Sequence, residues 1–327
     1  MADARSELAG RIMGFMLSQA IYVAAELRVA DLLDAGPWTA AELAAAADAD
    51  EEALYRLLRL LACFGIFVEQ DGRAFANSEQ SELLREGPGS FREFALVFGE
   101  EFYPAFGATL AMVRTGKPAF DAVFGAGWDD FLAAHPDKST RFNRFMQHGK
   151  DELAETLASL EWRGDETVID VGGGNGALLV ALLDRVPRLR GIVFDLPHVA
   201  AEAEGRIAAA GLSKRCDAVG GSYFDGVPAG GDVYVLSHIL HGWDGGRALD
   251  ILRSVRRAIP EDGRLLVNDG ILGAENPGLR LMDVLMLSVG GRERTEEEWR
   301  DLLDAGGFEV RTIHAAPRGT VLEAVPR

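Results

Sequence analysis

Five short apolar runs in the second half of the chain each end in residues that can do chemistry. Open parallel sheets bind ligands just beyond the carboxyl ends of their strands, so side chains at such ends meet at one edge. The pattern therefore predicts one site built from all five runs. The residues at these ends are Asp170 with the glycines that follow it, Asp195, Ser222 with Tyr223, Ser237 with His238 and His241, and Asp269.

The glycine loop fits two kinds of nucleotide site. Gly172, Gly174 and Ala177 satisfy the G-x-G-x-x-G/A fingerprint of dinucleotide sites. Asp170 stands directly before the glycines, where a pyrophosphate would meet a like charge. A ligand with an adenosine, a cationic tail and no phosphate suits this acid better, which favours S-adenosylmethionine over NAD. Asp195 lies about 20 residues beyond the loop, where an acid commonly binds two ribose hydroxyls; the alternative is a solvated carboxylate.

The two histidines after the fourth run invite a metal interpretation. His238 and His241 are three residues apart, and Asp244 follows them. Neither an H-E-x-x-H pattern nor a remote third cluster of ligands accompanies them. Cys63 and Cys216 likewise lack metal-ligand or redox spacing, so we expect free thiols, no metal and a cytoplasmic protein. We expect His238 to line the cofactor pocket.

The elements that position these residues alternate between apolar runs and helical segments after Trp162. This alternation predicts an α/β fold with a parallel sheet covered on both faces. The final two strands have so short a connection, at 317–319, that they must be antiparallel. The expected strands are 167–171, 191–195, 216–219, 232–236, 264–268, 308–313 and 320–325.

Before about residue 155 the apolar spacing is helical. A capping box at Thr39 and Glu42 predicts a helix that extends to Ala47. Helix, helix, helix and a small strand pair form the outline of a winged helix. The expected segments are helices at 12–33, 39–47 and 51–63 and strands at 67–69 and 74–76, around a turn at Asp71 and Gly72.

A chain of 327 residues is about twice a typical domain length. We expect a winged-helix-like dimerisation domain at 1–98 and a second domain at 99–327, whose helical linker region runs to about 160. In the linker, Phe142 and Met146 belong to an aromatic and methionine stripe broken at Gly116–Pro118 and His135–Pro136. Such a stripe is either core or a wall for a flat aromatic substrate.

The winged-helix outline allows DNA binding or dimerisation. The chain has 33 basic and 51 acidic residues, a formal net charge of −18, and therefore repels phosphates. We expect no nucleic-acid partner and, because no apolar stretch approaches 18 residues, no membrane partner. Residues 12–25 faintly resemble a signal-peptide core, but Asp3 and Glu7 precede them. The first helix is apolar over too much of its circumference for an N-terminal domain without a protein partner, which favours a homodimer.

Five segments together resemble the plant-type, caffeic-acid-like class I S-adenosylmethionine-dependent O-methyltransferases, including bacterial members that modify antibiotics. With the N-terminal winged-helix outline they span nearly the whole chain, and their order and spacing are more specific than any one of them. The segments are VIDVGGGNG (168–176), FDLPHV (194–199), LHGWD (240–244), RLLVNDGIL (264–272) and GGRERT (290–295).

The resemblance implies methyl transfer from S-adenosylmethionine to a small aromatic hydroxyl, with S-adenosylhomocysteine as product. His241 matches the family's general base, and Asp269 and Glu293 match the acids that orient it. A phenol has a pKa of about 10, so it needs a base at neutral pH. The implied cofactor-binding residues are Asp170, Gly172, Gly174, Gly176, Asp195, Leu196, Ser222, Tyr223, Ser237 and His238, and the implied acceptor-binding residues are Phe142, Met146, Trp243 and Met282.

Three departures from the family pattern concern the chemistry. Asp269 is one methylene shorter than the usual glutamate, Gly242 replaces an aspartate beside the base, and Ser222 replaces an acid expected to meet the adenine. These changes leave open the alternative that the chain is a family member that binds S-adenosylmethionine but has hydroxylase or pericyclase chemistry. The residues also leave open a ligand-sensing winged-helix regulator and an NAD-dependent oxidoreductase.

Overall fold

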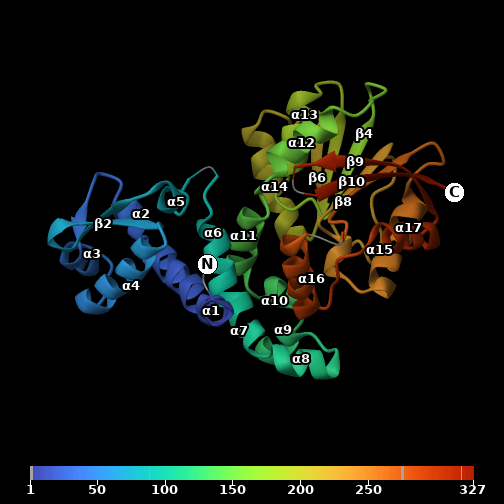
Figure 1. The fold of residues 1–327 in the computed structure, drawn as a ribbon. Coiled ribbons are helices and arrows are strands. Elements are labelled where there is room, and N and C mark those ends of the chain that lie inside the picture. The colour runs from blue at the N-terminus through green and yellow to red at the C-terminus, as the bar shows by residue number, and fades with distance from the viewer. Residues whose placement is uncertain (1–2, 88, 274–275, 318) are drawn as a thin grey trace. The chain divides into compact units, whose positions relative to one another are not determined.

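The computed structural model describes residues 3–87, 89–273, 276–317 and 319–327. It divides into two compact units, Met1–Gly107 and Ala108–Arg327 (Figure 1). Position 98, where the sequence analysis places the domain boundary, is the first residue of the π-helix Phe98–Phe102 in the first unit.

In the first unit, α1 (Ala4–Glu26) begins at Asp3, whose side chain accepts hydrogen bonds from the amides of Arg5 and Ser6. The predicted single helix at 12–33 is wrong at its start and in being continuous, although it ends one residue beyond Leu32, where the second helix ends. Arg28 adopts a left-handed conformation, with φ 56°, and separates α1 from α2 (Val29–Leu32).

The next elements follow the sequence pattern closely. The predicted capping box of Thr39 and Glu42 is confirmed and opens α3 (Ala40–Ala46). The predicted strand pair is also confirmed as an antiparallel hairpin, to which the two-residue strand β1, too short to predict, adds a third strand. The remaining elements of this unit are β1 (Trp38–Thr39), α4 (Glu51–Cys63), β2 (Phe67–Gln70), the short helix η1 (Asp71–Arg73), β3 (Ala74–Asn77), α5 (Glu79–Glu82), α6 (Arg92–Val97) and α7 (Tyr103–Gly107).

Helix α1 presents an apolar surface to solvent, with Ile12 65%, Phe15 52% and Met16 44% exposed. By length and mean hydropathy it is also the one helix, within the described residues, that meets the criterion for a membrane span. The count of uninterrupted apolar residues did not predict this. Core helices of soluble proteins and signal sequences meet the same criterion, so it does not by itself assign a membrane location.

The second unit begins with five helices whose breaks agree with the predicted ones. Gly116, with φ 69°, ends α8, and Pro136 is the first residue of α11. The five helices are α8 (Thr109–Thr115), α9 (Ala119–Phe124), α10 (Trp128–Ala134), α11 (Pro136–Phe145) and α12 (Lys150–Ala158).

A seven-stranded sheet follows, in the order β6-β5-β4-β7-β8-β10-β9. Strands β4 to β8 are parallel, and β10 is antiparallel to both β8 and β9, as predicted. Predicted strand ends agree within one residue except at β9, which runs on to Ala316; Arg318, in the predicted connection, lies outside the described residues. The strands are β4 (Thr167–Val171), β5 (Arg190–Asp195), β6 (Cys216–Gly220), β7 (Val233–Ser237), β8 (Arg264–Asp269), β9 (Phe308–Ala316) and β10 (Gly319–Pro326).

Helices cover both faces of this sheet, because successive side chains of a strand point to opposite faces. On β8, Leu266 packs into the cluster formed with α12, α13 (Ala177–Arg185) and α14 (Pro197–Ala209). Its neighbours Leu265 and Val267 pack into the opposite cluster, with α15 (Gly245–Ala258) and α17 (Glu296–Ala305). Figure 1 shows the two groups of helices on either side of the sheet.

Leu252→Ala should lower the free energy of unfolding by about 2–5 kcal/mol, because it leaves a cavity where α15 meets the sheet. Leu252 is fully buried in that cluster. The matched control, Leu110→Ala in α8, alters a side chain that is 64% exposed and should have little effect. Urea unfolding measures both, and equal effects would contradict this packing.

Candidate active site

His241 lies on the short helix η3 (Leu240–Gly242), directly beyond the end of β7. Its Nδ1 atom is 2.7 Å from Oε1 of Glu293, and the two side chains are 13% and 1% exposed. A carboxylate only accepts, so this contact places the proton on Nδ1 and leaves Nε2 with a free lone pair. A neutral imidazole held this way can accept a proton at Nε2.

A close backbone approach brings Glu293 to the histidine. After α16 (Pro277–Val289) ends at Gly290, the amide of Arg292 donates to the carbonyl of His241 at 2.8 Å. A Cβ atom on Gly291 would collide with that same carbonyl, so only glycine permits the approach. In the motif GGRERT, the glycine at 291 therefore permits the close approach, and the glutamate contacts His241.

Arg294 fixes the turn that carries His241. Its buried guanidinium donates to the carbonyls of Leu240 at 2.9 Å and Trp243 at 3.0 Å, which lie on either side of the histidine. Sequence reasoning missed this role, because an arginine in a polar loop gives no signal of burial.

Asp269 is fully buried at the end of β8, and its Oδ1 lies 3.8 Å from Nδ1 of His241. That distance is too long for a hydrogen bond, which agrees with a side chain one methylene shorter than the family's usual glutamate. Within the described residues, neither carboxylate oxygen has a hydrogen-bond partner. Asp269 therefore acts on His241 through its charge, and Glu293 makes the direct contact.

These acids set the basicity of His241. Burial by itself lowers the pKa of the imidazole, but the charges of Asp269 and Glu293 and the hydrogen bond to Glu293 outweigh it. The pKa of His241 therefore lies above its ordinary value, and the imidazolium formed on proton uptake is stabilised.

His238 shares Asp269 with His241, since its Nδ1 lies 3.7 Å from the same oxygen. Burial lowers the pKa of His238, and its backbone is in the left-handed region, with φ 59°. One ligand atom each from His238, His241 and Asp269 lie within 4.8 Å of one another, a grouping that a metal ion can use. The sequence predicted that these strand-end residues meet, but its metal interpretation considered Asp244 and not Asp269 as the acid beside the two histidines. Asp244, the acid considered there, instead caps α15 by accepting from the amide of Arg247.

The glycine loop joins β4 to α13, with positive φ angles at Gly172, Gly174 and Gly176. Asp195, at the end of β5, accepts hydrogen bonds from the amides of Gly174 at 2.8 Å and Leu196 at 2.7 Å. Burial raises the pKa of Asp195, and these two hydrogen bonds oppose that rise. Asp195, the acid predicted to bind ribose, is thus hydrogen-bonded to the glycine loop.

Asp170 is buried directly before this loop, and its Oδ2 has no hydrogen-bond partner within the described residues. Burial raises its pKa to about 6, although the charge of Lys150 opposes the rise. A Cβ on Gly173 would lie 2.8 Å from the Asp170 carboxyl, so glycine there leaves the acid accessible. An unpaired buried carboxylate beside a nucleotide-type loop fits a cationic ligand such as the ammonium of S-adenosylmethionine.

Aromatic side chains gather beside β6. Trp243 packs edge-to-face on Phe224, with ring centroids 5.0 Å apart, and lies 6.4 Å from Tyr223. Arg247 stacks over both Phe224 and Trp243. Trp243, which the sequence analysis expects to bind the acceptor, thus packs against the aromatic residues that follow β6. The hydroxyl of Ser222 accepts from the amide of Phe224 at 3.3 Å and so shapes this loop.

The remaining residues expected to bind the acceptor lie on helices of this unit. Phe142, in α11, packs edge-to-face on Trp128, with centroids 5.0 Å apart, and Met146 follows at the end of α11. Met282 lies on α16 beside Asp283, whose carboxylate accepts from the amide of Glu293. The helix carrying Met282 is therefore the one that also holds Glu293.

Lys150, at the start of α12, is a further charged residue that the sequence analysis missed. Its Nζ donates to the hydroxyl of Ser237 at 2.8 Å, and Asn268 donates to the same oxygen at 3.0 Å. A helix start and two strand ends thereby share one polar network. A lysine at a helix start, more than 80 residues from its partner, gives no signal in local spacing.

Comparison with known proteins decides the family. Residues 11–87 match the O-methyltransferase dimerisation domain, and residues 106–309 match the O-methyltransferase domain. The chain belongs to the O-methyltransferase family. Its methyl donor is S-adenosylmethionine, and it is an S-adenosylmethionine-dependent O-methyltransferase.

Relatives cover nearly the whole methyltransferase. It is 40% identical to the phenazine O-methyltransferase of Lysobacter antibioticus, over 96% of this chain and 94% of that protein. It is 38% identical to the 3-amino-4-hydroxybenzoate 4-O-methyltransferase of Streptomyces cremeus, over 98% and 91%. The crystal structure of LaPhzM superposes with a TM-score of 0.95, at 39% identity and 100% coverage of both chains. An O-methyltransferase of neocarzinostatin biosynthesis, solved with S-adenosylmethionine and 2-hydroxy-5-methyl naphthoic acid, superposes at 0.86, with 36% identity and coverage of 95% and 96%.

Glu293→Gln should lower the pKa of His241, because the imidazolium loses one of the two carboxylates that stabilise it. The chain has six histidines, so NMR titration of their ring protons can follow His241, assigned by its absence in His241→Gln. Glu296→Gln, an exposed acid paired with Arg300, is the matched control and should leave this pKa unchanged. A His241 pKa that is equal in Glu293→Gln and the unmodified protein would contradict the contact.

Proposed function

We propose that the enzyme methylates a hydroxyl group on a small aromatic natural product, with His241 as general base. The contact between Nδ1 of His241 and the buried Glu293 carries this proposal. It gives a base whose tautomer is fixed and whose protonated form is stabilised. Relatives supply the acceptor class, since the similar proteins are named for a phenazine, an aminohydroxybenzoate and a dihydroxynaphthoate.

The proposed mechanism assigns each group a physical task. Bound S-adenosylmethionine supplies a methyl group on a sulfonium. His241 takes the acceptor hydroxyl proton at Nε2, because a phenol with a pKa of about 10 is otherwise un-ionised at neutral pH. Glu293 orients the imidazole, and the buried charge of Asp269 stabilises the imidazolium. Arg294 fixes the turn that carries His241 by donating to two of its carbonyls.

The proposed cofactor-binding residues fit their tasks. Asp170 offers a buried, unpaired oxygen to an ammonium, and Asp195 lies against the glycine loop for the ribose. Tyr223, with Ser222 beside it, is proposed to bind the adenine, and we extend this group to Trp243 because of its packing on the neighbouring Phe224. Leu196, Ser237 and His238 complete this set, while Phe142, Met146 and Met282 are proposed for the acceptor.

A methyl acceptor on nitrogen is the second candidate, because one relative is a phenazine-1-carboxylate N-methyltransferase of Pseudomonas aeruginosa at 36% identity. The buried His241 and Glu293 pair favours oxygen, since a hydroxyl must lose its proton to attack. Hydroxylase or pericyclase chemistry is not favoured by the comparisons. A Cβ at Gly242 would meet nothing within 4 Å, so the missing aspartate leaves open space beside the base.

His241→Gln should reduce methyl transfer by about 10²–10⁴-fold, the usual contribution of a general base, and leave S-adenosylhomocysteine binding intact. Mass spectrometry with a trideuterated methyl donor, after a screen of hydroxylated benzoates, naphthoates and phenazines, measures the transfer. His314→Gln, on the β9 strand, is the control. Undiminished transfer by His241→Gln would eliminate the histidine as base.

We also propose a homodimer formed through the first unit. Its match to a dimerisation domain and the exposed apolar face of α1 support this assembly. A groove in the same unit, lined by α1, α4 and Tyr103, extends that face.

DNA binding is disfavoured for this winged-helix-like unit, because Arg59 lies 3.6 Å from Glu69 and Arg73 pairs with Glu51 and Glu52. With the net charge of −18, we propose no nucleic-acid or membrane partner. The two free cysteines suit a cytoplasmic location.

Ile12→Glu combined with Met16→Glu should convert the dimer to a monomer, because charges in a buried apolar interface lose their solvation. Light scattering after gel filtration measures the mass. Leu281→Glu, a change of an exposed leucine on α16, should leave the mass unchanged. A dimeric mass for the α1 double variant would exclude this face.

A further inference from the structure

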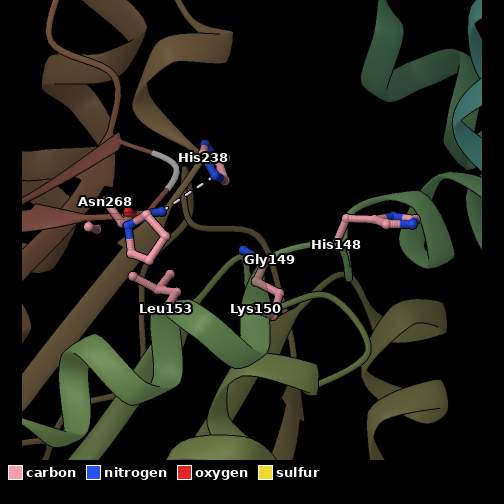
Figure 2. Close-up of a pocket in the computed structure, with 8 residues that line it drawn as sticks. His148, Gly149, Lys150, Leu153, His238 and Asn268 are labelled. Atoms are coloured by element: carbon pink, nitrogen blue, oxygen red, sulfur yellow. Dashed lines mark hydrogen bonds between the residues drawn. The ribbon is translucent and has the colours of Figure 1, made fainter. Parts of the chain in front are cut away.

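Lys150 is a charged side chain whose contacts are incomplete. Its only hydrogen-bond partner within the described residues is Ser237, although an ammonium has three donors. Figure 2 shows Lys150 at the start of its helix, with His238 and Asn268 across the small pocket that all three line. The remaining donors of this partly buried cation are available to an anionic ligand.

The acids around Lys150 balance its charge without pairing with it. Asp170 and Asp269 both act on Lys150 electrostatically, while burial lowers the pKa of the lysine. In the described part of the chain, no carboxylate lies within ion-pair distance of Nζ. Asp170 in turn keeps one buried oxygen unpaired. A free donor and a free acceptor of opposite charge thus share one edge of the sheet.

Strand pairing explains why these two groups are neighbours. β4 and β7 are adjacent and parallel, and Asp170 is in register with Val235. Ser237, which holds Lys150, lies two residues further along β7. Asn268, 4% exposed on the next strand, donates to the same hydroxyl and fixes its position. The ammonium of Lys150 is therefore held beside the strand that bears Asp170.

A paired cation and anion of this kind suit a zwitterion. The amino-acid end of S-adenosylmethionine carries an α-ammonium and an α-carboxylate, and Asp170 is already proposed for the ammonium. We propose that Lys150 binds the α-carboxylate of the cofactor, so that Asp170 and Lys150 together recognise its amino-acid end. This inference rests on the S-adenosylmethionine-dependent function, and it adds a binding residue to that site.

The test compares two ligands that differ in the amino-acid end. S-adenosylhomocysteine has the α-carboxylate, whereas 5′-methylthioadenosine keeps the adenosine and sulfur without the amino acid. Lys150→Met should weaken S-adenosylhomocysteine binding by roughly 10- to 100-fold, the range for a hydrogen bond to a charged group. Its affinity for 5′-methylthioadenosine should be unchanged. Isothermal titration calorimetry measures both affinities.

Lys214→Met, an exposed lysine before β6, is the matched control and should alter neither affinity. Lys150→Gln, which keeps a donor and loses the charge, is the second variant and should show the same ligand-dependent loss. Equal losses for the two ligands would assign Lys150 a structural role, and no loss for either would also overturn the inference. Failure of the unmodified enzyme to bind S-adenosylhomocysteine would instead contradict the cofactor itself, so the two failures are distinguishable.

Discussion

The buried hydrogen bond between His241 and Glu293 is the interaction on which the rest of the site depends. Removing His241 would leave the buried Glu293 carboxylate without its hydrogen-bond partner, and an unsatisfied buried polar group costs about 1–3 kcal/mol or more. The surrounding structure therefore has to hold both groups. It does so through the close approach permitted at Gly291 and through the two carbonyl contacts of Arg294. Both features lie in one short segment after α16, which makes that segment as important as the strand ends.

The edge of the sheet concentrates negative charge. Asp170, Asp195, Asp269 and Glu293 lie there, and within the described residues Asp170 and Asp269 leave oxygens unpaired. The positive charge of Lys150 offsets part of this negative charge. A cationic cofactor offsets the rest, and its sulfonium and ammonium explain why the site tolerates acids that a pyrophosphate would not. This charge requirement links the glycine loop, proposed to bind the donor, to the acids beside the proposed base His241.

Much of the fold was predictable from the sequence, because its signals are local. Apolar runs marked the strands, and the capping box at Thr39 and glycine breaks such as Gly116 marked helix ends. Contacts between elements far apart in the sequence could not be predicted in this way. The distance from Asp269 to His241, the carbonyl contacts of Arg294 and the position of Lys150 depend on how distant strands and helices meet. Arg28, whose left-handed backbone ends α1, shows that a break without glycine or proline also escapes pattern analysis.

The central claim is that His241 removes the acceptor proton during methyl transfer. The most direct measurement is the ratio of rates for the unmodified enzyme and His241→Gln across ring-substituted acceptors whose hydroxyl pKa values differ. A base matters most for a hydroxyl with a pKa of about 10 and little for one already ionised at the assay pH. We predict a ratio that falls toward one as the acceptor becomes more acidic. A ratio that stays large and constant across the series would contradict the role of His241 as base.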